Sequence, residues 1–365
     1  MNNLGIYIHV PFCNGKCYYC DFTSGLYSDD VKREYFIALS KEISAFDFNG
    51  YIVDSIYFGG GTPTSVNETY VSEIISLIKS LSNLSKCCEI SIECNPESFT
   101  RAKAIVYKNS GINRLSFGVQ SANDEILKKI GRLHRANDFV NSVKIANDYF
   151  DNISADIMLG LPAQTKKDVL DTITLLNDTE VKHISAYGLK IEKGTPLEKS
   201  GFVVDEDYTA DLYDCAVKLL SQYGYKRYEV SNFAKPDFEC KHNIKYWSRE
   251  EYVGFGVSAH SFYNEKRKAN TPNIFEYING QTTISEEIIK NNSMESLEEY
   301  LFLGLRTSKG INLKTLKEVY GYDLLKEKNN EILNLRDFIE IEDNRIFLKD
   351  RGFYVMNELI VRLMP

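Results

Sequence analysis

Residues 7–22 read YIHVPFCNGKCYYCDF, and they place Cys13, Cys17 and Cys20 in a C-x3-C-x2-C array. Thiolates packed this closely repel one another, and a bound cation relieves the repulsion, so the spacing predicts a metal or cluster site. A closed structural zinc site needs a fourth ligand, and no fourth cysteine stands nearby. Three cysteines on a cubic iron-sulfur cluster instead leave one iron open to a further ligand. Three ordinary reduced cysteines are the competing interpretation.

Around this stretch, short β-branched runs alternate with amphipathic segments as far as about Lys190, which is typical of βαβ units and a parallel sheet. The pattern predicts strands near residues 4–10, 53–58, 89–94, 113–119, 153–159 and 183–189. It predicts helices near residues 30–46, 67–82, 100–109, 136–148 and 166–177. The alternation alone fits either a barrel or a doubly wound sheet. The cysteines and other unusual residues fall at the carboxyl ends of the strands, where barrel active sites are built, which favours the barrel.

The alternation breaks beyond Lys190, where the sequence predicts a helix near residues 207–223 and then an aromatic, glycine-rich segment over residues 229–262. Further on, it predicts helices near residues 295–306, 312–319 and 322–335, short strands at Ile339–Ile341 and Ile346–Leu348, and a last helix from Asp350. Helices followed by a small hairpin indicate a winged-helix-like domain. We therefore expect a barrel core at residues 1–190, a barrel extension at 191–290 and a C-terminal domain at 291–365.

The composition limits the partners and the compartment. The chain has 365 residues, a formal net charge of −8 and a sequence pI near 5.4, which argues against a generic nucleic-acid binder because such a protein needs a basic face to neutralise phosphates. A local basic patch stays open. No secretory signal and no apolar run of membrane-spanning length is visible. We therefore expect a cytoplasmic protein whose cysteines stay reduced and free to bind a metal or cluster.

The cysteine array, with Tyr19 just before the third cysteine, resembles the radical S-adenosylmethionine (SAM) superfamily. The wider string at residues 7–22 resembles the oxygen-independent coproporphyrinogen III oxidase family, and in particular its haem-chaperone subgroup, HemW. The resemblance implies an α/β fold, a partial (β/α)6 TIM-like barrel with a small C-terminal winged-helix-like α+β domain. It also implies a [4Fe-4S] cluster on Cys13, Cys17 and Cys20, with SAM on the open iron.

The string GGGTP at residues 59–63 follows the apolar strand DSIYF. Consecutive glycines let a backbone approach a ligand without interference from Cβ atoms, although a simple glycine turn would look the same. The string lacks the lysine of a phosphate-binding P-loop. The resemblance places Gly60, Gly61 and Thr62 against the amino group of SAM.

Further candidate ligands of SAM follow later strands. Glu93 ends the run CEISIEC, and such a carboxylate either accepts hydrogen bonds from two ribose hydroxyls or caps the helix after it. The resemblance places Glu93 on the SAM ribose. It places Gln120, Arg132 and Asp156 where the oxidase branch contacts a second SAM molecule. Arg132 and Asp156 could equally form a buried ion pair with no ligand.

The first strand carries two polar candidates, Tyr7 and His9, which alternate with isoleucines and so share one face of the strand. The resemblance puts Tyr7 at the position nearest the bound SAM. A histidine on such a face is more often a hydrogen-bonded core residue, so we expect His9 only to support Tyr7.

Residues 242–247, HNIKYW, contain the only tryptophan of the chain and resemble the H-N-x-x-Y-W string of the haem-chaperone subgroup. A neutral imidazole is a common axial ligand of haem iron, and aromatic side chains supply apolar walls for a porphyrin. The resemblance therefore implies that His242, Tyr246 and Trp247 bind haem, with His242 as the iron ligand. Cys240 is a rival axial ligand, His260 is a weaker candidate, and an ordinary polar loop histidine is the alternative interpretation.

Two departures from the oxidase pattern favour haem delivery. The oxidase pattern is C-x3-C-x2-C-x-C, and Phe22 stands where that pattern has its fourth cysteine. Only twelve residues precede Cys13, so we expect no long N-terminal segment that covers the substrate. Without that cover a deoxyadenosyl radical is less protected from solvent. We therefore expect a chaperone that binds the cluster, SAM and haem and passes haem to an apoprotein.

The alternative is an oxygen-independent coproporphyrinogen III oxidase of porphyrin biosynthesis. It would use an electron donor and a deoxyadenosyl radical to start decarboxylation of propionate side chains. If the protein is an enzyme, the resemblance therefore implies a dehydrogenase-type oxidoreductase. A radical SAM enzyme that modifies nucleic acid is disfavoured by the acidic composition.

Overall fold

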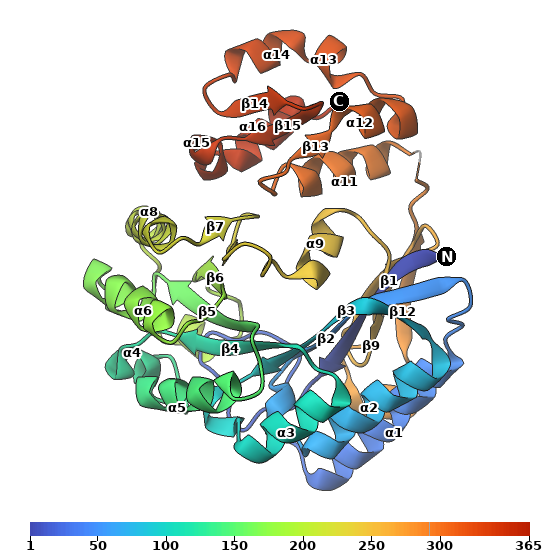
Figure 1. Ribbon diagram of the computed structural model, residues 1–365, viewed down its shortest axis with the longest axis vertical. Coiled ribbons are helices and arrows are strands. Elements are labelled where there is room, and N and C mark those ends of the chain that lie inside the picture. Colours follow the sequence, from blue (N-terminus) through green and yellow to red (C-terminus); the bar gives the residue numbers. More distant parts are fainter. Residues whose placement is uncertain (292) are drawn as a thin grey trace.

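The fold is a curved sheet with helices on its outer side and a small α+β unit above its open side (Figure 1). The structure is a computed structural model that describes residues 1–291 and 293–365. Six parallel strands confirm the predicted βα repeat. They are β1 (Asn2–Val10), β2 (Tyr51–Gly60), β3 (Asn83–Cys94), β4 (Arg114–Gln120), β5 (Ile153–Leu159) and β6 (His183–Gly188).

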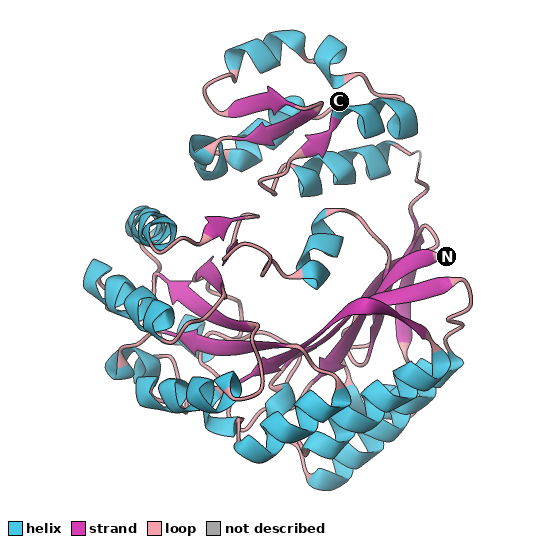
Figure 2. Ribbon diagram, viewed as in Figure 1, coloured by secondary structure: helices cyan, strands magenta, loops and turns pink. Residues whose placement is uncertain are grey.

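Helices cover the convex face of the sheet, where Figure 2 shows them in cyan. They are α1 (Asp29–Ala45), α2 (Glu68–Leu81), α3 (Arg101–Ser110), α4 (Asp124–Lys129), α5 (Ala136–Asn147), α6 (Lys166–Asp178) and α8 (Glu206–Gln222), while α7 (Pro196–Lys199) is a single turn. Helix α2 illustrates the cause: Asn67 caps its first turn, and residues at helical spacing, Val71, Ile74, Ile75 and Ile78, are buried against the sheet.

The sheet is wider than the predicted six strands. Its order is β12-β11-β10-β9-β1-β2-β3-β4-β5-β6-β8-β7, with β9 parallel to β1 and the other added strands antiparallel. The two edge strands do not pair, so the barrel stays open, as the predicted partial barrel requires. The added elements are β7 (Lys226–Arg227), β8 (Asn232–Ala234), β9 (Tyr252–Phe255), β10 (His260–Tyr263), β11 (Lys266–Asn270), α10 (Ile274–Ile278) and β12 (Thr283–Ile288).

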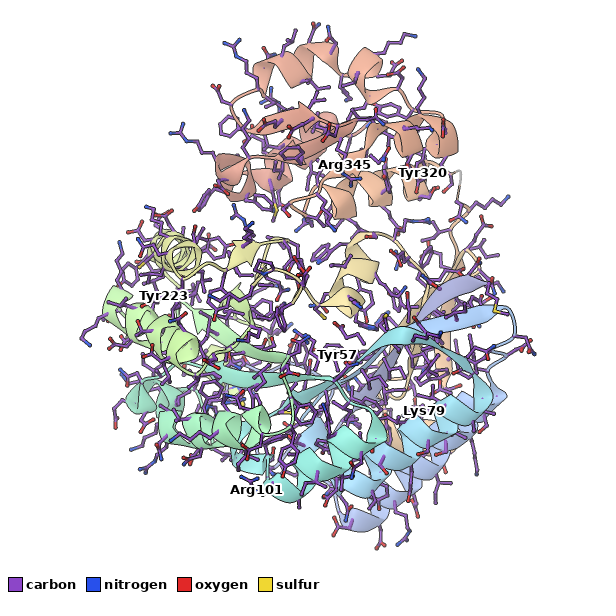
Figure 3. The ribbon with its side chains drawn as sticks, in the orientation of Figure 1. Tyr57, Lys79, Arg101, Tyr223, Tyr320 and Arg345 are labelled. Atoms are coloured by element: carbon purple, nitrogen blue, oxygen red, sulfur yellow. The ribbon has the colours of Figure 1, made fainter. Side chains whose placement is uncertain are left out.

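Helix α9 (Lys241–Trp247) lies inside the curve of the sheet (Figure 1). Tyr57 of β2 lies between the sheet and this helix, as Figure 3 shows. The alternative interpretation of His242 as an ordinary polar loop residue is wrong, because the HNIKYW string lies in this helix and His242 is buried. The helix forms without a capping side chain of its own, because Glu89 of β3 accepts hydrogen bonds from the backbone N–H groups of Lys241 (3.1 Å) and His242 (3.2 Å).

The chain from Met294 to Leu363 has a hydrophobic core of its own. Its three-stranded antiparallel sheet, in the order β13-β15-β14, and its surrounding helices match the winged-helix-like expectation. The predicted helix at 322–335 is broken at Lys328, and the last helix is broken at Val355. The elements are α11 (Met294–Gly304), β13 (Ile311–Asn312), α12 (Leu313–Tyr320), α13 (Leu324–Glu327), α14 (Asn329–Asn334), β14 (Ile339–Glu342), β15 (Arg345–Leu348), α15 (Asp350–Tyr354) and α16 (Met356–Leu363).

The parallel register brings the strand ends to one edge of the sheet. Val10 pairs with Gly60, and Cys94 pairs with Phe117, so the loops that follow β1 to β4 open on the same side. Within residues 1–291 and 293–365, no helix is long and apolar enough to cross a lipid bilayer.

Candidate functional site

A cavity of about 450 Å³ lies at the carboxyl ends of the parallel strands. Most of the predicted cluster and SAM residues line it, namely Cys13, Cys17, Tyr19, Cys20, Gly60, Gly61, Thr62, Glu93, Gln120, Arg132 and Asp156. These residues come from six separate segments of the chain, and the fold alone brings them together. The volume lies within the usual range for a small-ligand pocket.

The cysteine loop is fastened by Lys16, which lies between the first two cysteines. Its Nζ donates hydrogen bonds to the carbonyl oxygens of Phe22 (2.6 Å) and Ser24 (3.2 Å) and to the Ser24 hydroxyl (3.0 Å). The backbone N–H of Cys13 donates to the carbonyl of Gly25 at 3.0 Å, which closes the loop on itself. The three thiols are therefore presented on a folded loop.

Two of the three sulfurs receive a hydrogen bond from the cavity wall. The Thr62 hydroxyl donates to the Cys13 Sγ at 3.6 Å, and the Arg132 Nη1 donates to the Cys17 Sγ at 3.4 Å. Burial raises the pKa of the Cys20 thiol, and the Lys16 ammonium opposes that rise. Donors of this kind stabilise ligated thiolates and tune an iron-sulfur cluster.

The donor geometry distinguishes a cluster from a single ion. In the described part of the chain, no three His, Cys, Asp or Glu side chains converge on one metal-ion position. The three thiols nevertheless share one cavity with sulfur-directed donors. Three cysteine thiols spread around one cavity fit an iron-sulfur cluster better than a site for a single zinc ion.

The glycine segment after β2 packs tightly against the cysteine loop. Gly60 has φ +107°, and a Cβ there would lie 2.5 Å from the Cε1 atom of His9. A Cβ on Gly61 would lie 2.7 Å from the carbonyl oxygen of Phe12. The backbone N–H of Thr62 donates to that same carbonyl at 2.7 Å. Glycine is therefore required here for close packing of two loops as well as for access to a ligand.

Glu93 is held at the cavity floor by two donors. The Tyr57 hydroxyl donates to its Oε1 at 3.0 Å, and the Gly60 backbone N–H donates to its Oε2 at 3.2 Å. Burial and the neighbouring Asp156 carboxyl raise the pKa of Glu93 to about 7, against the opposing effect of these hydrogen bonds. The carboxylate faces the cavity, and it does not cap the following helix turn with its side chain.

Arg132 and Asp156 do not form the ion pair that the sequence left open. The Arg132 Nη2 donates to the Asn95 Oδ1 at 2.7 Å and to the Gly118 carbonyl at 2.5 Å. Asp156 instead accepts from the Ser116 hydroxyl at 3.5 Å, and burial raises its pKa. Gln120 ends β4 with a left-handed φ of +65°, a backbone strain that concentrates at functional sites.

Tyr7 lies outside this cavity and lines a neighbouring one of about 420 Å³. Its hydroxyl lies 3.1 Å from the His9 Nδ1. Tyr246 and the exposed His260 also line this second cavity, and Phe22 lines both. Phe22, which stands in place of a fourth cysteine, therefore borders both the cluster cavity and the aromatic one.

His242 is buried, and both of its ring nitrogens are engaged. Its Nδ1 lies 2.9 Å from the Ser55 hydroxyl, and its Nε2 lies 2.8 Å from the Tyr246 hydroxyl. Burial, with Lys245 and Arg114 nearby, lowers the pKa of His242 to about 3, so the ring is neutral. The fold keeps this imidazole away from the cluster cavity and offers no free nitrogen in this conformation.

The rival ligand Cys240 is equally enclosed. Its Sγ donates to the Glu89 Oε1 at 3.5 Å, and burial raises the pKa of its thiol to about 12. Trp247 is half-buried at the end of α9. The predicted haem residues therefore form one helix that is docked inside the sheet.

Sequence reasoning missed several residues that support the site. Asn95 donates to the Thr62 hydroxyl at 3.0 Å and accepts from Arg132, so it links the glycine segment to Arg132. Its place two residues after Glu93 at a strand end was a usable signal. Ser55, Tyr57 and Glu89 lie within strands, where the sequence offers no comparable signal.

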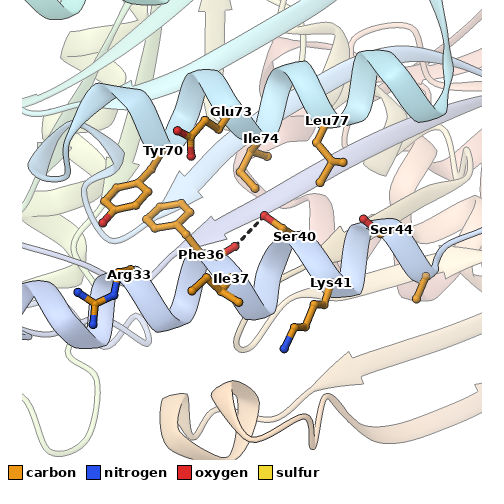
Figure 4. A pocket seen from close by; sticks show the side chains of 11 residues that line it. Arg33, Phe36, Ile37, Ser40, Lys41, Ser44, Tyr70, Glu73, Ile74 and Leu77 are labelled. Carbon is orange, nitrogen blue, oxygen red and sulfur yellow. Dashed lines mark hydrogen bonds between the residues drawn. The ribbon is translucent and has the colours of Figure 1, made fainter.

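A larger cavity of about 810 Å³ lies between α1 and α2 on the outer side of the fold. Figure 4 shows that its walls mix apolar side chains such as Phe36 and Leu77 with Arg33, Lys41 and Glu73. No cysteine or histidine lines it. It is therefore separate in position and chemistry from the cluster cavity.

Comparison with known proteins agrees with this geometry. The Radical SAM superfamily model matches residues 7–176, and the HemN C-terminal domain model matches residues 293–355. A heme chaperone HemW of Bacillus subtilis (strain 168) is 34% identical, with 97% of this chain and 97% of that chain covered. The chain belongs to the HemW family within the radical SAM superfamily.

A second HemW, of Lactococcus lactis subsp. lactis (strain IL1403), is 32% identical, with 98% of this chain and 96% of that chain covered. The solved structure of coproporphyrinogen III oxidase (HemN) from Escherichia coli matches with a TM-score of 0.85 at 20% identity, over 100% of this chain and 90% of that chain. That structural likeness shows a common fold.

Membership of the radical SAM superfamily implies a [4Fe-4S] cluster and SAM as cofactors of this HemW-family chain. The cavity fits them, because it presents three thiols with sulfur-directed donors, a close-packed glycine segment and the half-buried carboxylate of Glu93. When bound, these cofactors supply one-electron and radical chemistry.

Proposed function

We propose that the protein is a haem chaperone on a radical SAM scaffold, which binds haem and delivers it to an apoprotein. The observation that carries the proposal is the likeness to heme chaperone HemW proteins over nearly the whole chain, at 34% identity for the protein of Bacillus subtilis. Phe22 stands at the position where the oxidase pattern has a further cysteine, and this difference supports the same choice.

In this proposal Cys13, Cys17 and Cys20 hold the [4Fe-4S] cluster. Gly60, Gly61 and Thr62 face the amino group of SAM, since their tight packing leaves a backbone edge at the cavity. Glu93 accepts the two ribose hydroxyls, for which a half-buried carboxylate with only two protein donors has lone pairs available. Tyr19 supplies an aromatic wall of this cavity, and Tyr7 supplies one of the neighbouring cavity, which Phe22 also lines.

Gln120, Arg132 and Asp156 would contact a second SAM molecule at the far wall of the same cavity. The strained backbone of Gln120 and the absence of an ion pair between Arg132 and Asp156 support a ligand-binding role for this wall. The proposal therefore includes a second SAM molecule in this cavity.

Haem would bind at α9, with His242 as axial ligand and with Tyr246 and Trp247 as porphyrin contacts. Because both nitrogens of His242 are engaged, haem ligation requires α9 to release the Ser55 or Tyr246 hydroxyl. We call α9 closed when His242 keeps both hydrogen bonds, and open when one of them is released. The closed form is then haem-free, and the affinity for haem depends on the fraction of the protein in the open form. Cys240 remains the rival ligand on the same helix.

The barrel core would comprise residues 1–190, the haem-binding extension 191–290 and the C-terminal domain 291–365. The eight free cysteines support a reducing location, the cytoplasm. The alternative function is oxygen-independent coproporphyrinogen III oxidation, which would need an electron donor for the cluster. The common fold with the oxidase of Escherichia coli is compatible with that alternative and does not favour it over haem delivery.

Haem titration of the anaerobically reconstituted protein tests the proposal. The Soret band should shift on binding, and His242→Ala should alter the spectrum of the bound haem because the iron loses its ligand. His260→Ala, at the exposed histidine of β10 that is the weaker candidate, is the comparison variant: it should leave the spectrum unchanged, and a changed spectrum would make His260 the ligand. An unchanged spectrum in His242→Ala would remove His242 as the ligand.

A further inference from the structure

Tyr57 contacts both Glu93, which lines the SAM cavity, and His242 of α9. It lies on β2 inside the curve of the sheet (Figure 3). Its hydroxyl donates to the Glu93 Oε1 at 3.0 Å, and its ring stacks on the His242 ring with centroids 5.3 Å apart and planes 25° apart. One side chain therefore joins the proposed ribose ligand to the proposed haem ligand.

Glu93 and His242 are each fixed by a further contact on the side away from Tyr57. Glu93 is held by the Gly60 backbone, which belongs to the glycine segment packed on the cysteine loop. His242 is held by the Ser55 and Tyr246 hydroxyls on a helix whose first turn is bound by Glu89. A displacement of the Tyr57 hydroxyl at Glu93 is therefore transmitted to the contact of its ring with His242, because the surrounding packing leaves little free space.

We propose that Tyr57 is a positioning residue that couples occupancy of the Glu93 carboxylate to the position of α9, so that SAM binding promotes haem binding. This inference rests on the proposed function, because it takes Glu93 as the ribose ligand and α9 as the haem element. It adds a regulatory link that neither site has by itself.

Hydrogen bonding by the ribose supplies the physical cause. Ribose hydroxyls that donate to the remaining lone pairs of the Glu93 carboxylate spread its negative charge over more hydrogen bonds, which weakens the bond from the Tyr57 hydroxyl. The weakened bond lets the Tyr57 ring turn and give up its stacking on His242. Release of His242 favours the open form of α9, which is the form that ligates haem.

Coupling of this kind is reciprocal. If SAM raises the affinity for haem by some factor, haem raises the affinity for SAM by the same factor, and such factors typically lie at about 5 to 150. We expect the dissociation constant of SAM to fall at least about fivefold when haem is bound, because the SAM and haem ligands share Tyr57.

Isothermal titration of SAM into the cluster-loaded protein, with and without haem, measures the coupling. The wild type should give a ratio of dissociation constants of at least about five, and Tyr57→Phe should bring the ratio close to one. Tyr51→Phe is the matched control, because Tyr51 lies on the same strand and donates to Asn264 at 3.2 Å, away from both sites. It should keep the wild-type ratio.

Trp247 provides a readout that does not need haem. It is the only tryptophan of the chain and lies on α9, so its fluorescence reports that helix directly. SAM should change the fluorescence of the wild type and of Tyr51→Phe but not of Tyr57→Phe. A response in Tyr57→Phe equal to that of the wild type would overturn the inference.

The outcomes separate the inference from the proposed function. If haem does not bind at all, the proposed function fails, and the inference is then judged on the Trp247 response to SAM alone. If haem and SAM both bind but their affinities are independent in the wild type, the inference fails while the proposed function stands. A wild-type protein that does not bind SAM overturns both.

Discussion

Glu93 combines burial with a functional position, and its ionisation should control SAM binding. Only the charged carboxylate accepts both ribose hydroxyls, and burial raises the pKa of this group to about 7 in the free protein. SAM affinity should therefore increase as the pH rises through 7, by about tenfold between pH 6 and pH 8, following the ionised fraction. Isothermal titration across this pH range measures the effect. The matched variant Glu93→Gln should bind SAM weakly and without this pH dependence, whereas a flat profile in the wild type would contradict the assignment.

The cluster cysteines can be tested against a cysteine elsewhere in the same chain. Cys17→Ser removes a soft thiolate and the acceptor of the Arg132 hydrogen bond, so the broad iron-sulfur absorbance should be lost after anaerobic reconstitution. Cys87→Ser, at an exposed cysteine on β3, should retain it. A full four-iron content in Cys17→Ser would contradict the cluster assignment.

At the residue scale, the sequence predicts most of the residues that line the site and misses several supporting residues that lie within strands. Cys13, Gly60, Glu93 and Gln120 follow apolar runs, so their common location at one edge of a parallel sheet could be expected. Tyr57 and Glu89 sit inside runs that look like ordinary strand sequence. Their roles depend on α9, which is distant in the sequence and becomes a neighbour only in the fold.

At the scale of elements, α9 depends on a carboxylate from another strand. Glu89 accepts from two backbone N–H groups of the first turn and from the Cys240 thiol. Glu89→Ala should lower the free energy of unfolding by about 1–3 kcal/mol, because buried donors lose their acceptor. Chemical denaturation measures the change, and Glu340→Ala, at an exposed strand residue of β14, is the matched control.

The same variant tests whether α9 must open. If the closed helix is the haem-free form, Glu89→Ala should raise the apparent affinity for haem, because a larger fraction of the protein is open. A decrease in haem affinity would instead indicate that the docked helix is itself the haem-binding form.

The sequence could not predict α9 as a helix for a physical reason. The segment has only seven residues, and its N-cap, Cys240, makes no capping hydrogen bond with its side chain. Buried Lys245 contributes through ion pairs of 2.9 Å with Asp54 and Glu250, which are again tertiary contacts. By contrast α1 and α2 were predicted closely, because each carries its own cap and its own apolar face.

At the scale of the molecule, the C-terminal unit closes the side of the sheet on which α9 lies. Arg249, two residues after α9, forms an ion pair with Glu299 of α11 at 2.8 Å. The backbones of Glu229 and Thr307 form an isolated antiparallel β-bridge. Burial raises the pKa of Glu229 to about 7. The sequence predicts both folding units from their patterns. The added strands β7 to β11 have only two to five residues each, and β12 is exposed along its whole length, so no periodicity marked them and the width of the sheet could not be predicted.

The central claim is that this radical SAM scaffold handles haem as cargo. The most direct measurement is a paired assay on one anaerobic, cluster-loaded preparation, which follows haem uptake by the Soret band and the conversion of coproporphyrinogen III in the presence of SAM and a reductant. We predict stoichiometric haem binding and no protoporphyrinogen IX. Conversion of coproporphyrinogen III to protoporphyrinogen IX with stoichiometric release of methionine would contradict the claim.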